Sequence, residues 1–469
     1  MGQGGLGRLY DRLAVPGQTL ALNTFGLRNL RRMWAWNHYL GSIESTERMP
    51  RQDQIALTAG LLRESMLSAL DTVPFYAPYG NLRQALIAPQ TDPFAILGEF
   101  PILTRQEVMA APELFLSNRF QRKDLVRTVT SGTTGTPFAT WMEPRTFLQT
   151  DALWWRRTAW AGYRFPQWIA RLVGDPIVPM RDDSPKQPYR LSWTDRRLYL
   201  STFHLNLETA GRYLDVLERR QPEYLMGYPS SLEILAGYAQ QLGRKLSWRP
   251  KAILFSSEPM FEHQREAILA VFPSRIVGLF GTAERFVSAS QCESDTYHLS
   301  LVDGYVEGQF GLRDPVQPAL MTPLLNRAMP LLRFQLGDHL DCLPELECPC
   351  GRTLPAISPV VTKQEDWLET PTGRRISPSA LTWAFKDLPG VRRSQIVQEE
   401  LGVVTVKLDV PQEQMTSAAT TVRNLLTPMF FGEVEVRCVR DSQIEIMSSG
   451  KTRFVVRKLS RRDNRPTSI

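Results

Sequence analysis

The stretch LVRTVTSGTTGTPFATWME, residues 125–143, is the part of the chain from which the rest can be interpreted. Two runs of strand-forming residues, 125–129 and 138–142, flank a loop of glycines and hydroxyl side chains. Glycine lets backbone N–H groups wrap an anion closely, and serine and threonine add donors around phosphate oxygens. The loop is not a Walker motif, which needs a lysine and a helix directly after it. From these residues alone, a phosphate loop and an ordinary turn between two strands are equally good interpretations.

The composition and charge describe a large globular protein with no preference for nucleic acid. The chain has 469 residues, enough for two or three domains, of which 43% are apolar and 22% charged. Its net charge of +7 is modest, and the one dense basic run, at residues 457–465, is typical of a solvated terminus. We therefore expect no nucleic-acid partner.

Apolar runs and cysteine usage bear on the cellular compartment. No run approaches the roughly 20 apolar residues that a membrane span needs. Charged residues interrupt the start of the chain, where a signal peptide would have its apolar core. Five cysteines, an odd number in a long chain, argue against a disulfide framework. These patterns predict a cytoplasmic protein without a membrane span.

The periodicity of apolar residues changes along the chain. Residues 1–100 are predicted to be mostly helical, because apolar side chains recur at helical spacing from Leu57 to Leu70. From about residue 118, short apolar runs alternate with helical patterns, which predicts βαβ units on a parallel or mixed sheet. The predicted strands are 252–255 and 276–280, and the predicted helices are 207–219, 261–272 and one capped by Ser230 or Ser231 that ends at Leu242.

A second change of composition, at residues 359–366, marks a domain boundary. Beyond it, a hairpin around Leu401 and Gly402, followed by a helix and a strand, forms a compact α+β unit of about one hundred residues. We therefore predict an α/β fold whose large N-terminal domain, residues 1–364, is built on mixed β-sheets with flanking helices. A small C-terminal α+β domain is expected at residues 365–469.

Polar motifs follow two of the predicted strands. Ser256, Ser257 and Glu258 come at the end of one strand, and residues 280–284, FGTAE, end the next. In open α/β sheets, ligands bind beyond the carboxyl ends of the strands. Both motifs therefore stand where a binding site is expected.

Seven motifs in a fixed order carry a resemblance to a known family. They are TSGTTGTP at 130–137, YLMGYPSSLEILA at 224–236, FSSEPM at 255–260, FGTAE at 280–284, LLRFQLGD at 331–338, CPCGR at 348–352 and SGKTR at 449–453. The chain resembles the adenylate-forming enzymes of the acyl-CoA synthetase superfamily, in particular the CapK-like (capsule-cluster) relatives in the phenylacetate–CoA ligase branch. The resemblance runs from about residue 50 to residue 458. It implies a first half-reaction in which a carboxylate attacks the α-phosphate of ATP, giving acyl-AMP and pyrophosphate.

The resemblance implies a nucleotide site made of loops that are far apart in the sequence. The β- and γ-phosphates would be held by Ser131, Gly132, Thr133, Thr134, Gly135 and Thr136. Adenine and its surroundings would be bordered by Ser257, Glu258, Phe280 and Gly281. Asp338 would accept hydrogen bonds from the ribose hydroxyls. Tyr228 and Gly281 would border the acyl pocket.

Catalysis of this kind is mainly positioning and electrostatics. Thr282 would contact the α-phosphate, and Glu284 would coordinate Mg²⁺, a hard cation that prefers oxygen ligands. Lys451 would reach the carboxylate and the α-phosphate and offset the charge of the transition state. The small domain is mobile in the family, with a hinge expected at Asp366, and its swing would admit CoA as the second substrate.

Two positions depart from the family pattern. Many relatives carry lysine just after the proline of the loop, where this chain has Phe138, so one charge partner of the phosphates is missing. The family tends to have an arginine near ribose before the hinge acid. Here Lys363 stands in that stretch and lacks the planar fork of a guanidinium.

Cysteines and a histidine form a second set of candidate ligands. They are Cys292, His298, Cys348 and Cys350. Thiolates with an imidazole are a structural zinc set, and several members of the resembled branch bind Zn²⁺ with such residues. The spacing is irregular, and Cys342 is an alternative ligand. Without the resemblance, buried free cysteines are the better interpretation.

The acyl substrate and the acceptor stay open at this level. An aryl or aryl-acetic acid fits the branch, and a fatty acid or a sugar acid is not excluded. One or two aromatic residues after the loop are candidates for the acyl pocket, from the set Trp154, Trp155, Trp160, Tyr163 and Phe165. We predict an acid–CoA ligase that uses ATP, Mg²⁺ and CoA, and a homodimer is compatible with it. The alternatives are an adenylating transferase that serves a carrier protein, an amine or a glycan precursor in polysaccharide or secondary metabolism, and a non-catalytic nucleotide-binding descendant.

Overall fold

A computed structural model describes residues 5–129, 138–179, 185–315, 317–336, 338–359, 368–376, 380–381, 385, 391, 393–441, 444 and 454–459. In these ranges, no helix combines the length and the apolar character that crossing a membrane requires.

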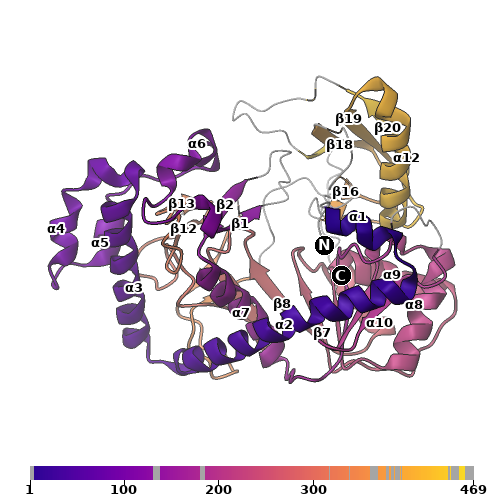
Figure 1. Cartoon of the computed structure of the whole chain (residues 1–469), viewed down its shortest axis with the longest axis horizontal. Coiled ribbons are helices and arrows are strands. Elements are labelled where there is room, and N and C mark those ends of the chain that lie inside the picture. The colour runs from indigo at the N-terminus through magenta and orange to yellow at the C-terminus, as the bar shows by residue number, and fades with distance from the viewer. Residues whose placement is uncertain are drawn as a thin grey trace, which may run out of the picture.

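The N-terminal hundred residues are helical, as the sequence predicts. Their helices are α1 (Gly5–Arg12), α2 (Val15–Ile43), α3 (Arg51–Thr72), α4 (Leu82–Ile87) and α5 (Pro93–Leu97). The short α6 (Arg105–Ala110) begins in a capping box between Thr104 and Glu107. In Figure 1 the long α2 runs along the lower side of the molecule and packs on α7 (Pro144–Trp160), while α3 to α6 lie at the left.

A ten-stranded mixed sheet forms the centre of the protein, in the order β14-β15-β10-β9-β8-β7-β6-β3-β5-β4. The five strands from β8 to β5 in this order are parallel, and each outer strand pairs antiparallel with its neighbour. Their bounds are β3 (Ile169–Leu172), β4 (Tyr189–Ser192), β5 (Arg197–Leu200), β6 (Tyr224–Gly227), β7 (Ala252–Ser256), β8 (Arg275–Gly281), β9 (Ser288–Gln291), β10 (Tyr297–Leu299), β14 (Cys342–Leu343) and β15 (Ala356–Ile357). The predicted mixed sheet is therefore confirmed, including the strands at 252–255 and 276–280.

Helices cover both faces of this sheet, because its strands send apolar side chains to both sides. Ile253 and Ile276 belong to a core shared with three helices on one face. Leu254 and Val277 belong to a second cluster on the other face, with residues of α2 and α7 packed against it. The three helices on the first face are α8 (Leu207–Arg220), α9 (Pro229–Gln241) and α10 (Glu262–Val271).

The start of α9 differs from the sequence prediction. The helix begins at Pro229 with Tyr228 before it, and the predicted cap at Ser230 or Ser231 is wrong. Ser230 instead donates its hydroxyl to Glu258, which lies 28 positions later in the sequence. Local spacing does not reveal such a long-range partner.

Two smaller sheets complete the large part of the chain. Their strands are β1 (Val126–Val129) and β2 (Ala139–Met142), which pair antiparallel as predicted, and β11 (Gly304–Val306), β12 (Leu320–Pro323) and β13 (Phe334–Gln335). Arg333, just before β13, donates to the carbonyls of Gly98 and Phe100 at 3.0 and 2.9 Å. It also pairs with Glu307 at 2.8 Å. Arg333 therefore ties the three-stranded sheet to the N-terminal helical region.

The C-terminal unit contains a four-stranded sheet, ordered β20-β19-β18-β21. Its elements are β16 (Leu368–Glu369), β17 (Arg375–Ile376), β18 (Arg393–Glu400), β19 (Val403–Asp409), α12 (Met415–Leu426), β20 (Glu435–Arg440) and β21 (Val455–Arg457). The strands β18 and β19 form the predicted hairpin. This unit lies at the upper right of Figure 1, above α8 and α9. The predicted boundary after residue 364 lies outside the described residues, so the domain limits stay a prediction.

An arginine joins this C-terminal unit to the large part of the chain. Arg374 donates to Glu233 of α9 at 3.1 Å and lies 3.5 Å from Glu433. Its guanidinium covers the ring of Phe431 at 4.1 Å. Burial raises the pKa of Glu233, although hydrogen bonds from Gln264 and Arg374 oppose this effect. The buried carboxylate therefore depends on its partner across the two units.

Replacing Arg374 with methionine is expected to lower the free energy of unfolding by about 1–2 kcal/mol, because it removes a partner of a buried carboxylate. Chemical denaturation measures this change, and amide hydrogen exchange should become faster in residues 393–441. The matched control is Arg437→Met, since Arg437 pairs with Glu435 at the exposed surface. Equal stability of the two variants would contradict the role assigned to Arg374.

Candidate functional site

Three of the sequence motifs lie at one edge of the central sheet. The strands β6, β7 and β8 are parallel neighbours, so their carboxyl ends meet. Tyr228 follows β6, and the pair Ser257 and Glu258 follows β7. Thr282 and Glu284 lie in the turn after β8. The sheet thus brings together residues predicted to border adenine, the α-phosphate and the acyl pocket.

A buried carboxyl group ties the loop after β7 to the start of α9. Ser257 has a φ of 74°, a left-handed backbone that is uncommon for a residue with a side chain. Glu258 accepts hydrogen bonds from the N–H and the hydroxyl of Ser230, both at 3.1 Å. Burial raises the pKa of Glu258 to about 7, against the opposing effect of these hydrogen bonds. Glu258 therefore fixes the loop that is predicted to border adenine.

The turn after β8 keeps its polar side chains inside the protein. Thr282 and Glu284 are buried, and the Thr282 hydroxyl accepts a hydrogen bond from the N–H of Phe286 at 3.4 Å. Arg285, with a φ of 59°, pairs with Asp151 of α7 at 3.1 Å. This ion pair holds the turn against α7.

The side chain of Trp154 lies against Gly281, the last residue of β8 before this turn. A Cβ on Gly281 would lie 3.0 Å from Nε1 of Trp154, which is closer than an ordinary contact. Glycine therefore allows α7 to approach the strand end here. The guanidinium of Arg285 covers the Trp154 ring at 4.3 Å. Trp154, one of the aromatic candidates, is thereby placed beside a predicted acyl-pocket residue.

An arginine that the sequence patterns did not reveal lies beside the position that departs from the family. Phe138, which stands where many relatives carry lysine, is buried and stacks on Phe334 with ring centroids 5.5 Å apart. The guanidinium of Arg105, the first residue of α6, covers the Phe138 ring at 5.3 Å. Burial lowers the pKa of Arg105, and the nearby charge of Glu284 opposes this. The protein thus places a cation near the predicted magnesium ligand, and it comes from a separate helix that no local motif marks.

The other predicted nucleotide residues are described only in part. Asp338 follows β13, and its backbone carbonyl accepts a hydrogen bond from the N–H of Ala319 at 3.0 Å. Outside the described residues lie Ser131, Gly132, Thr133, Thr134, Gly135, Thr136, Lys363, Asp366 and Lys451. The roles of all these residues stay predictions.

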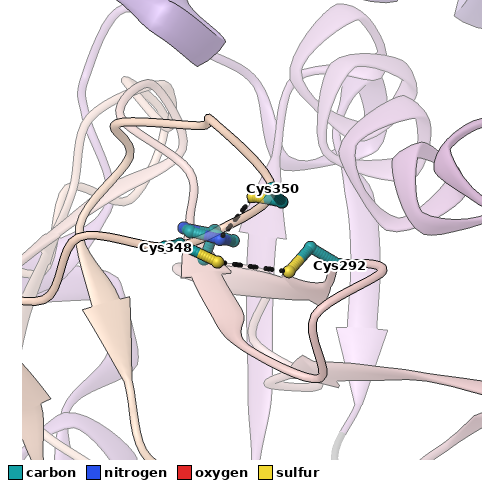
Figure 2. Close-up of side chains that lie close together, drawn as sticks. Cys292, Cys348 and Cys350 are labelled. Atoms are coloured by element: carbon teal, nitrogen blue, oxygen red, sulfur yellow. Dashed lines mark hydrogen bonds between the residues drawn. The ribbon is translucent and has the colours of Figure 1, made fainter.

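The four predicted thiol and imidazole ligands lie together near the β14 end of the central sheet. Their ligand atoms are all within 4.8 Å of one another. The sulfurs of Cys292 and Cys348 are 3.6 Å apart, and the Cys350 sulfur is 3.4 Å from Nε2 of His298. Figure 2 shows the three cysteine side chains pointing toward one another. Cys342, the alternative ligand, lies in β14 and is not part of this set.

The surroundings of this cysteine–histidine set fit a tetrahedral zinc ion. Zinc binds sulfur at about 2.3 Å and nitrogen at about 2.1 Å, so one ion can reach four atoms at this spacing. When Nδ1 of His298 donates to the carbonyl of Leu354, 3.0 Å away, Nε2 keeps its lone pair for a metal. The backbone N–H groups of Ser294 and Arg352 donate to two of the sulfurs, at 3.3 and 3.4 Å, and favour thiolates. We interpret the set as a candidate structural zinc site.

Known proteins with similar sequences support the resemblance. Residues 368–458 match the family of CapK C-terminal domains. The chain is 22% identical over 241 residues to Protein CapK of Staphylococcus aureus, a match that covers 51% of this chain and 53% of that protein. The match therefore spans about half the length of this curated relative.

Solved structures with a similar fold include an acyl-CoA ligase captured in two states. The chain is similar to 2-hydroxyisobutyryl-CoA ligase in complex with 2-HIB-AMP and CoA, with a TM-score of 0.54 and 18% identity over 88% of this chain and 92% of that one. The same ligase in its postadenylation state with R3-HIB-AMP gives a TM-score of 0.53 and 17% identity over 90% and 91%. The chain has the fold of the adenylate-forming ligases. Its segment 368–458 matches the CapK C-terminal domain family, so the resemblance found in the sequence is confirmed.

The purified protein is expected to contain about one zinc ion per chain, which elemental analysis by mass spectrometry measures. Cys348→Ser should lose the ion and lower the Tm by roughly 5–10 °C, because the ion joins separate segments of the folded chain. Cys438→Ser is the matched control, since Cys438 lies in β20, away from the set. If the wild-type protein folds without bound zinc, the assignment of a zinc site is wrong.

Replacing Glu258 with glutamine is expected to raise the free energy of unfolding above that of the wild type. This difference between variant and wild type should grow as the pH rises. In the folded state the pKa of Glu258 is about 7, above its ordinary value of 4.5, so the folded protein holds an extra proton between these values. The stability of the wild type therefore falls through this window by about 2–3 kcal/mol on account of this one group. The amide has no charge to bury and can still accept from Ser230.

Denaturant unfolding near pH 5 and near pH 8 measures this effect. The control is Glu413→Gln at an exposed position. A difference in unfolding free energy between Glu258→Gln and wild type that stays constant with pH would argue against the raised pKa.

Proposed function

We propose that this chain activates a carboxylic acid with ATP, giving acyl-AMP and pyrophosphate, and then passes the acyl group to CoA. The observation that carries the proposal is the common sheet edge where Tyr228, Glu258 and Thr282 follow three neighbouring parallel strands. This edge is where ligands bind in open α/β sheets. The fold shared with a ligase solved in complex with 2-HIB-AMP and CoA supports the same chemistry.

In the proposed site, side chains orient the reactants and offset charge. Thr282 would contact the α-phosphate, and Glu284 would hold Mg²⁺, which would supply positive charge to the phosphate oxygens. Lys451 approaches the α-phosphate and the substrate carboxylate as negative charge develops between them. Arg105, near Glu284 and over the ring of Phe138, supplies the positive charge that a phenylalanine cannot. The Gly/Thr loop at residues 131–136 holds the leaving pyrophosphate.

The proposed substrate is an aryl or aryl-acetic acid, and the proposed acceptor is CoA. The indole of Trp154 beside Gly281 supports an acyl pocket with an aromatic wall. A second candidate acceptor is a carrier protein, an amine or a glycan precursor. It is retained because the C-terminal segment, which admits the acceptor in the proposed cycle, matches the CapK family.

Pyrophosphate release with a panel of carboxylic acids, measured with and without CoA, tests the proposal. Acid-dependent pyrophosphate together with acyl-CoA supports an acid–CoA ligase. Acid-dependent pyrophosphate without acyl-CoA favours the second acceptor class. ATP binding without turnover for any acid overturns the proposal and leaves a nucleotide-binding protein without catalysis.

Lys451→Ala is expected to slow adenylation by about 10²–10³-fold, because one stabilising charge is lost from the transition state. The Kd for ATP should change by only a few-fold, since the loop and the sheet edge still bind the nucleotide. The control is Lys458→Ala, because Lys458 pairs with Glu399 at an exposed position. Normal adenylation by Lys451→Ala would show that the catalytic assignment is wrong.

A further inference from the structure

Arg157 is a buried cation of α7 that no motif of the family explains. Arg157 is only 5% exposed, and its Nη1 donates to the backbone carbonyl of Trp154 at 3.1 Å. Its Nε is buried and has no hydrogen-bond partner among the described residues. Burial lowers the pKa of Arg157 to about 10, so the guanidinium stays charged at neutral pH. A buried charge without a counter-ion is strongly destabilising, and no carboxylate among the described residues acts on Arg157, so an anion from outside this part of the chain is the simplest explanation.

The charged groups around Arg157 leave one positive charge unmatched in the described part of the chain. Arg171 of β3 and Arg197 of β5 share a face of the sheet, because the pairing register puts Arg197 opposite the residue two positions before Arg171. Arg171 pairs with Asp175 at 3.2 Å. The charge of Asp195 acts on Arg197. Arg171 and Arg197 are thus each acted on by the charge of an aspartate, whereas no carboxylate among the described residues acts on Arg157.

Two series of contacts connect Arg157 with the residues proposed to border the acyl pocket. Arg157 donates to the main-chain carbonyl of Trp154, and the indole of Trp154 in turn packs on Gly281, where a Cβ would lie 3.0 Å from the indole nitrogen. The second connection runs through Arg171, whose charge acts on Arg157 and which contacts β6, the strand that Tyr228 follows. Arg171 donates at 3.5 Å to the methionine sulfur two residues before Tyr228. Trp154 and Arg171 therefore connect Arg157 to the two residues that are expected to border the acyl group.

We propose that Arg157 binds a second anionic group of the acyl substrate, remote from the carboxylate that is activated. This inference rests on the proposed function above. A guanidinium recognises carboxylate, phosphate and sulfate groups through a fixed fork of donors, and it remains charged when buried. An acid without such a group would leave the buried charge unmatched. The substrate class therefore narrows to dicarboxylic acids and to carboxylic acids that carry a phosphate or a sulfate.

Steady-state pyrophosphate release with matched pairs of acids tests this inference. The pairs are phenylacetate against its para-carboxy, para-sulfo and para-phospho derivatives, and pentanoate against glutarate. For the wild type, kcat/KM should be at least about 30-fold higher for the acid with the second anionic group. Among the carboxy, sulfo and phospho derivatives, the acid with the highest kcat/KM identifies which anionic group the site binds.

Arg157→Met should abolish this preference by lowering kcat/KM for the dianionic acid about 30-fold or more, while the monoanionic acid stays within about threefold. Arg157→Lys keeps the charge but not the fork, so it should retain part of the preference and tests the inference even if the methionine variant does not fold. Arg164→Met is the matched control, because Arg164 is an exposed arginine just beyond α7.

The outcomes separate this inference from the proposed function. The inference is overturned if the wild type has equal kcat/KM for both acids of each pair. It is also overturned if Arg157→Met lowers kcat/KM equally for both acids. Either result leaves the proposed adenylation intact. Absence of acid-dependent pyrophosphate with every acid overturns the proposed function and this assignment with it.

Discussion

The candidate site depends on three short parallel strands whose carboxyl ends meet at one edge of a sheet. Parallel strands cannot be joined by a tight turn, so a crossover must separate them, and here α9 and α10 are those crossovers. Residues as distant as Tyr228, Glu258 and Thr282 therefore become neighbours only when the sheet is complete. Burial on both faces holds the strands, and the Glu258–Ser230 hydrogen bonds then fix one of the loops at that edge.

Much of this arrangement could be predicted because strand ends and glycine-rich loops leave local marks in a sequence. The strands at 252–255 and 276–280 and the hairpin around Gly402 were visible from apolar runs and turn residues. The predicted cap at Ser230 was wrong because its partner lies on another strand loop. Arg105 and Arg157 could not be found for a similar reason, since their importance comes from burial beside distant segments rather than from spacing.

The cysteine–histidine set is connected to α7 through packing contacts. It joins the β9–β10 hairpin to the turn at residues 348–351, two strands away from β8. Arg352, directly after this turn, covers the ring of Trp160 at 4.0 Å and lies 3.3 Å from Glu47. Trp160 ends α7, the helix that carries Trp154 and Arg157. An ion in this set would therefore stabilise the position of α7, the helix whose Trp154 packs on Gly281.

The proposed site uses two arginines, one for the phosphates and one for the acyl group. The charge of Glu284 acts on Arg105, which is proposed to serve the phosphates, and Arg157, which is proposed to serve the acyl group, donates to the main-chain carbonyl of Trp154. Arginine suits both places because burial lowers its pKa without removing its charge, whereas a buried lysine readily becomes neutral. A methylene more or less in a pocket changes selectivity by about 1–3 kcal/mol. An unmatched buried charge costs more than that, so charge at the far end of the acid, rather than the size of the acid, would dominate what this pocket accepts.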